Sequence, residues 1–210
     1  MPAVSPARTS PSAFYMLVPP RGEGRFARGY ARGTWINDVL CRECGQAQSE
    51  LVPPLLVEWG PAIGQVLGDF TACGASVISE SCSQRMETEL GLQFRTEPVK
   101  TIKERVHKQP PPSSPDQGGL LWLRGACMEA AADNEQGQAL VQRCPACKRR
   151  KGGTMFGKML VCNRKALESA LFEVPDYGGS TNIYAAEAVR DRLARANFSN
   201  LAFLRAGYLV

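Results

Sequence analysis

The sequence predicts an α+β fold in which a mixed or antiparallel sheet is flanked by a few helices. Short apolar runs bounded by Gly and Pro recur along the 210 residues and predict several strands. Only a few segments have the apolar spacing of amphipathic helices. An apolar fraction of 44% and a charged fraction of 21% are those of an ordinary globular protein, so the chain can bury a substantial core.

The N-terminal part begins with a polar tail and continues with strands and loops. Residues 1–13 are rich in Pro, Ser and Ala and predict a disordered tail. FYMLV at 14–18 predicts the first strand, whereas the basic, glycine-rich stretch 19–33 predicts a loop. The apolar stretch 51–59 predicts a further strand, and another apolar stretch follows at 73–79.

Three segments predict helices. Residues 79–91 combine an N-cap at Ser79, apolar residues at four-residue spacing and a stop at Gly91. A short helix is expected over 163–172, which begins with an Asn cap. In 185–198 apolar residues line one face and charged residues occupy most of the rest, which is typical of an amphipathic helix.

The remaining elements are extended segments and one long loop. Residues 92–99 predict an extended segment, and strands are expected in 120–130, 155–162 and 201–210. The Pro/Gly-rich stretch 108–119 predicts a loop.

Four of the eight cysteines form two CxxC motifs, which have the spacing of metal ligands. CRECG at 41–45 and CPACK at 144–148 each place two thiols in one turn, and Zn²⁺ prefers a tetrahedron of four thiolates. We therefore expect one structural zinc ion in a zinc ribbon-like site, held by Cys41, Cys44, Cys144 and Cys147. The site would join segments on either side of the loop at 108–119, so residues 14–210 are expected to form a single α+β domain with two zinc knuckles.

Other uses of the cysteines are less favoured. A redox role requires a CxxC that follows a strand in a βαβ pattern and begins a helix, and neither motif does so. The four single cysteines are expected to be buried small hydrophobic residues; they are Cys73, Cys82, Cys127 and Cys162.

The sequence lacks the residue patterns of common enzymes. The only histidine, His107, lies in a polar segment and is a poor candidate for a nucleophile partner or metal ligand. The sequence contains neither a Walker loop nor a Rossmann fingerprint. We expect no catalytic activity and no small-molecule substrate.

The sequence also predicts a cytoplasmic location. The N-terminal residues lack the continuous apolar core of a secretory signal. No later stretch approaches the roughly 18 to 20 apolar residues that a membrane span requires, so no membrane association is expected.

A basic run directly follows the second cysteine motif. Four cations backed by two glycines could bind phosphates; they are Lys148, Arg149, Arg150 and Lys151. The formal charge of +5 and the pI near 8.8 favour acidic partners only mildly. The run contains no aromatic residues for base stacking, and short charge runs are often only solvated. Nucleic-acid binding by a zinc-ribbon protein is therefore the second hypothesis.

The two cysteine motifs and the layout around them resemble the double-CXXCG motif family of bacterial proteins, known chiefly from myxobacteria. The matches in the motifs are Cys41, Cys44, Gly45, Cys144, Pro145 and Cys147. Lys148 departs from the family, which has glycine at this position. WGPAIGQVLGDF in the middle and the closing IYAAEAVRDRLARANFSNLAFL are also similar to the family's layout.

The resemblance implies a function. Members of this family are classed as immunity proteins, which neutralise a cognate toxin delivered between kin cells. The implied partner is a protein toxin, and the implied role is binding and inhibition without turnover.

Overall fold

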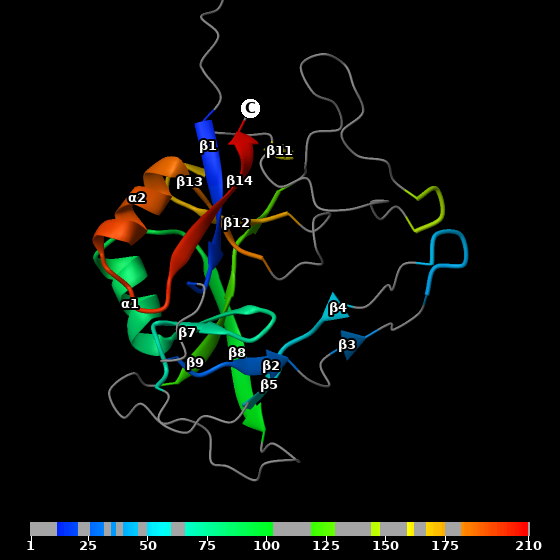
Figure 1. Cartoon of the computed structure of the whole chain (residues 1–210), viewed down its shortest axis with the longest axis horizontal. Helices are drawn as coiled ribbons and strands as arrows, with labels where there is room; N and C mark the ends of the chain where they lie inside the picture. The colour runs from blue at the N-terminus through cyan, green and yellow to red at the C-terminus, as the bar shows by residue number, and fades with distance from the viewer. Residues whose placement is uncertain are drawn as a thin grey trace, which may run out of the picture.

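Two six-stranded mixed sheets and two helices contain most of the residues that the structure, a computed structural model, describes (Figure 1). The α+β prediction is confirmed, although the described strands form two main sheets where the sequence predicts one. The structure describes residues 12–20, 26–31, 35–36, 40–45, 50–59, 66–102, 119–128, 144–147, 159–161, 167–174 and 182–209.

The first sheet brings the two ends of the described chain together (Figure 1). Its order is β10-β12-β13-β1-β14-β11, in which β10–β12 and β11–β14 are parallel and the other pairs antiparallel. The longest pairing joins β1 to β14, with a register shift between Phe14 and Tyr15. The strand bounds are β1 Ser12–Val18, β10 Ala126–Cys127, β11 Met159–Val161, β12 Leu171–Glu173, β13 Tyr184–Ala186 and β14 Ala202–Leu209.

The second sheet has the order β2-β5-β8-β9-β7-β6, and only β5–β8 is a parallel pair. Its two edges approach each other, because the N–H of Ala31 donates to the carbonyl of Cys73 at 2.9 Å. The strand bounds are β2 Gly29–Ala31, β5 Leu55–Trp59, β6 Phe70–Ala72, β7 Ser76–Ser79, β8 Arg95–Ile102 and β9 Leu120–Arg124. A separate pair, β3 (Trp35–Ile36) and β4 (Glu50–Leu51), is antiparallel.

Two helices complete the described elements. Helix α1 (Glu80–Thr88) begins as predicted, since the Ser79 hydroxyl accepts from the N–H of Cys82 at 3.1 Å. Gly91 has φ +59, a left-handed conformation typical of the residue after a helix. Helix α2 (Glu187–Arg195) follows β13 without a side-chain cap.

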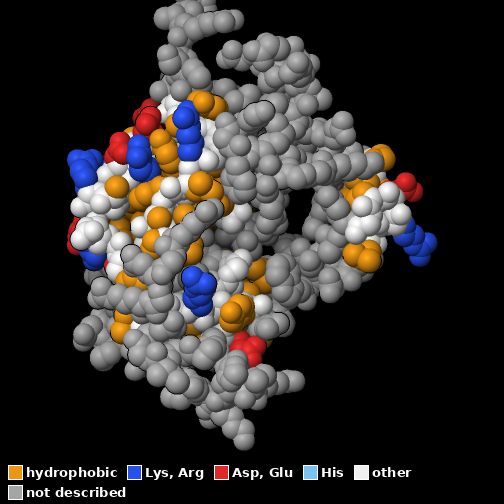
Figure 2. Space-filling model, viewed as in Figure 1, with side chains coloured by type: hydrophobic (Ala, Val, Ile, Leu, Met, Phe, Trp, Pro, Cys, Tyr) orange, Lys and Arg blue, Asp and Glu red, His pale blue; other side chains and the backbone are white. Residues whose placement is uncertain are grey.

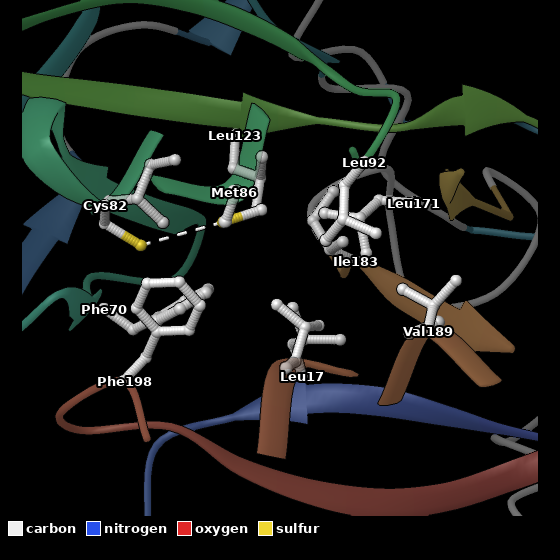
Figure 3. Packing of buried hydrophobic residues seen from close by; sticks show 13 residues of the cluster. Leu17, Phe70, Cys82, Met86, Leu92, Leu123, Leu171, Ile183, Val189 and Phe198 are labelled. Atoms are coloured by element: carbon white, nitrogen blue, oxygen red, sulfur yellow. Dashed lines mark hydrogen bonds between the residues drawn. The ribbon is translucent and has the colours of Figure 1, made fainter. Parts of the chain in front are cut away.

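The largest apolar cluster lies where the helices meet both sheets (Figure 3). Met86 of α1 and Val189 of α2 share this cluster with Leu17 of the first sheet and Leu123 of the second. All four side chains are buried. Since burial of apolar area is the main favourable term in folding, this cluster fixes the two sheets against the helices.

A second contact between the sheets is polar. The chain leaves β9 through Gly125 and enters β10 in the first sheet. The buried carboxylate of Glu173 accepts from Arg124 Nε at 2.7 Å, from Arg124 Nη2 at 3.1 Å and from the N–H of Gly125 at 2.8 Å. This ion pair therefore fixes the segment in which the chain crosses from the second sheet to the first.

One predicted helix is wrong. The sequence predicts a helix over 163–172, whereas the described part of that range ends in β12. All three residues of β12 are buried. A strand that is buried on both faces shows no alternation of apolar and polar residues, so its apolar run could not be distinguished from helical spacing.

The predicted loop at 19–33 is wrong in part, because it contains β2. This three-residue strand exists through its pairing with β5, in which Gly29 lies opposite Trp59. A Cβ on Gly29 would lie 2.5 Å from Val57 Cγ1, so the close approach of the two strands requires glycine. A local sequence pattern cannot reveal a strand that forms only by pairing with a distant segment.

Several boundaries also differ. The first strand begins at Ser12, inside the predicted tail, and residues 1–11 lie outside the described residues. The helix predicted over 185–198 is shorter, because its first two residues belong to β13. The predicted loop at 108–119 lies outside the described residues except for Gly119.

Candidate metal centre

The two cysteine motifs lie side by side, away from the two sheets and near the β3–β4 pair (Figure 1). In the first motif the N–H of Gly45 donates to the carbonyl of Cys41 at 2.8 Å and closes the turn. Gly45 has φ +69, which residues with a Cβ rarely adopt. The local sequence therefore builds a tight knuckle that directs both thiols to one side.

The four predicted ligands come together, although 103 positions separate the paired cysteines in the chain. Cys41 Sγ lies 3.8 Å from Cys144 Sγ, and Cys44 Sγ lies 3.7 Å from Cys147 Sγ. All four sulfur atoms lie within 4.8 Å of one another. These distances are much longer than the roughly 2.05 Å of a disulfide bond.

The spacing of the sulfur atoms fits a metal ion. Four sulfurs at about 2.3 Å from a tetrahedral zinc ion lie about 3.8 Å from one another. The distances of 3.7 and 3.8 Å between the paired cysteines match this value. The four cysteines are therefore placed to hold a metal ion, and an all-sulfur donor set suits a thiophilic one.

Backbone hydrogen bonds favour the thiolate form that a metal requires. The N–H groups of Cys44 and Glu43 lower the pKa of Cys41 from 9.0 to about 6, against the opposing effect of burial. The N–H groups of Cys147 and Ala146 likewise lower the pKa of Cys144. Each knuckle thus stabilises negative charge on its own first cysteine.

The cluster is asymmetric in its exposure. Cys41 and Cys144 are buried, whereas Cys44 and Cys147 are half-buried. The outer surface of the first knuckle carries exposed Arg42 and Glu43. The basic run that begins at Lys148 lies outside the described residues.

The three single cysteines that the structure describes do not join the cluster, and one of them differs from its prediction. Cys73 and Cys82 are buried, as expected, and burial raises the pKa of both thiols, that of Cys73 to about 11. Cys127 is exposed, and so is Ala126, the other residue of the short strand β10. Cys162 lies outside the described residues.

Two features of the sheets have no signal in the sequence. The first is the ion pair between Arg124 and Glu173, because Glu173 follows two apolar residues and nothing local indicates its partner. The second is a pocket beside β6, which is built from residues far apart in the chain. Spatial proximity of this kind depends on the sheet order.

Neither α1 nor α2, each of nine residues, has the length and apolar character needed to cross a bilayer.

The described residues contain one cluster of potential metal ligands, and it consists of the four cysteines that the sequence predicts. It does not by itself identify a family, since four-thiol sites occur in many unrelated folds. The resemblance to the double-CXXCG family remains a prediction. Comparison of the chain with protein-family models and with curated proteins finds no match.

Proposed function

We propose that this chain is a cytoplasmic immunity-type protein that binds and neutralises a cognate protein toxin, and that one structural zinc ion stabilises it. The observation that carries the proposal is the four-thiol cluster formed by the two CxxC motifs. These motifs are also the residues on which the resemblance to the immunity family rests. The proposal therefore combines a site that the geometry supports with a role that the resemblance implies.

The metal in this proposal has a structural role. Four thiolates complete the tetrahedral shell of Zn²⁺, and no position is left for water or substrate. The ion would join two segments 103 residues apart, so its binding free energy would contribute directly to folding.

A binding role places few demands on individual residues. Neutralisation of a toxin requires complementary shape and charge over an interface, and no catalytic groups. The surface around the knuckles offers a mixture of apolar and charged side chains (Figure 2). Leu40 is 65% exposed beside the exposed Arg42 and Glu43.

The direct test is affinity capture of the tagged chain from its native cells, with and without nuclease. The expected result is a stoichiometric protein that survives nuclease and high salt. That protein is then expressed alone and together with the chain. Arrest of growth by the captured protein, and rescue by the wild-type chain, would support the proposal. Lack of toxicity, or toxicity that the chain does not relieve, would refute it.

The second candidate is a zinc-ribbon protein that binds nucleic acid. It is favoured by the position of the basic run 148–151, which directly follows the described knuckle at Cys144–Cys147. Phosphate contacts by Lys and Arg make affinity strongly dependent on salt. Replacement of all four basic residues by Ser should then abolish a salt-sensitive shift of DNA or RNA, and an unchanged shift would exclude this role for the run.

A further inference from the structure

The four clustered cysteines are not equally accessible. Cys41 and Cys144 are buried, with exposed fractions of 6% and 0%. Cys44 and Cys147 are half-buried, and each is the second cysteine of its knuckle. The cluster therefore has a covered side and a partly exposed side, and each knuckle contributes one cysteine to the exposed side. We call Cys44 and Cys147 the outer pair.

The sulfur atoms of the outer pair lie close together, although 103 positions separate the two residues in the chain. Their distance is 3.7 Å, and a disulfide bond of about 2.05 Å requires them to approach by roughly 1.7 Å. Because the two sulfurs belong to separate segments, a small movement of one knuckle against the other brings them together and breaks neither turn. A disulfide between Cys41 and Cys44 would instead form inside the turn that the N–H of Gly45 closes onto Cys41 at 2.8 Å. The arrangement therefore favours a bond between the knuckles.

Oxidation of the outer pair by hydrogen peroxide balances without a further reactant. Both cysteines are thiolates when they serve as metal ligands. The sulfur of Cys44 attacks one peroxide oxygen, the O–O bond breaks and hydroxide leaves, which gives a sulfenic acid. The thiolate of Cys147 then attacks this sulfur, the S–S bond forms, the S–O bond breaks and a second hydroxide leaves. The two thiolates together lose two electrons and the peroxide gains them; the roles of the two residues are interchangeable.

The disulfide would act on the candidate metal centre. A disulfide sulfur carries no negative charge, so only the thiolates of Cys41 and Cys144 would remain as ligands, which is half of a structural zinc shell. We propose, on the basis of the metal in the proposed function, that the outer pair is a reversible oxidation site for hydroperoxides, at which disulfide formation releases the metal. The new bond joins the same two segments, so the knuckles stay together when the ion has left.

Hydrogen peroxide tests this site on the full chain purified with zinc. A chromophoric chelator follows free zinc, a sample without peroxide gives the background, and thiols are counted after denaturation. We expect the loss of one zinc ion per chain together with two of the eight thiols. Peptide mapping without reduction should find Cys44 linked to Cys147, and dithiothreitol with added zinc should restore the thiols and the ion. Retention of zinc in excess peroxide, or a disulfide within one knuckle, would overturn the proposal.

Cys127 provides the matched control, because it is exposed and lies outside the cluster. Cys127→Ser should lose zinc at the wild-type rate and form the same disulfide. Slower loss of zinc in this variant would show that oxidation begins at Cys127 and would contradict the role of the outer pair.

The outcomes distinguish the oxidation site from the proposed function. A chain purified without zinc would refute the metal assignment and the oxidation site with it. A chain that holds zinc and forms no disulfide between Cys44 and Cys147 would refute the oxidation site alone. Toxin binding does not enter this experiment, so failure of the toxin role leaves the expected disulfide unchanged.

Discussion

At the residue scale, the two cysteine motifs differ in the residue that follows the second cysteine. Gly45 takes this position in the first motif, where φ is +69 and its N–H closes the turn onto Cys41. Lys148 takes it in the second motif and lies outside the described residues. A left-handed backbone costs a residue with a Cβ roughly 1–2 kcal/mol, so the first knuckle depends on its glycine.

Gly45→Ala should therefore weaken metal binding. A Cβ at this position meets no atom within 4 Å, so the cost is conformational and not steric. A loss of 1–2 kcal/mol corresponds to a roughly five- to thirtyfold lower zinc affinity, measured by competition with a chelator. Gly45→Asn should lose less, because asparagine tolerates this conformation. Gly119→Ala is the control, and unchanged affinity of Gly45→Ala would contradict the argument.

The thiols outside the cluster should differ in reactivity. The thiolate is the nucleophile, and burial raises the pKa of Cys73 from 9.0 to about 11 and that of Cys82 also. At pH 8 alkylation of the native chain, followed by peptide mapping, should label exposed Cys127 before the buried Cys73 and Cys82. Because the unfolded thiol ionises near pH 9.0, the contribution of Cys73 to stability is present below that pH and is lost as the pH rises through about 11. Rapid labelling of Cys73 at pH 8 would contradict this order.

At the element scale, prediction succeeded where the signals are local. The N-cap at Ser79 and Gly91 define α1 within the segment itself, and the strand at 14–18 is an apolar run after a polar stretch. It failed where an element depends on a distant partner, as β2 does on β5, or where burial on both faces removes periodicity, as in β12. The order of strands within the two sheets follows from long-range contacts that no local pattern contains.

The crossover between the sheets should be sensitive to one substitution. Arg124→Met would leave the carboxylate of Glu173, 1% exposed, without its bidentate partner. Removal of one partner of a buried ion pair costs about 3–5 kcal/mol, towards the lower end here because Arg124 is 19% exposed. Unfolding in urea measures this loss, and Arg95→Met, at an exposed position of β8, is the control. Equal stability of the two variants would show that the pair contributes nothing.

At the scale of the whole molecule, the described structure combines a body of two sheets and two helices with a lobe formed by the two cysteine knuckles, Cys41–Gly45 and Cys144–Cys147. The two sheets and both helices share buried apolar clusters. The two knuckles stand apart from this body in Figure 1. The paired CxxC motifs allowed the sequence to predict which cysteines meet, because metal ligation leaves a spacing signal that packing does not. The proposed metal would join the two knuckles of this lobe directly.

Metal removal should thus act on the lobe before the body. Purified chain should contain one zinc ion, and Cys144→Ser should lose it, whereas Cys127→Ser should keep it because the exposed Cys127 is not in the cluster. In hydrogen exchange with chelator, the N–H of Gly45 should lose protection while strand β1, which pairs with β13 and β14, keeps it. Simultaneous loss of protection in β1 would mean that the metal holds the entire fold. Chain purified without stoichiometric metal would contradict the metal assignment itself.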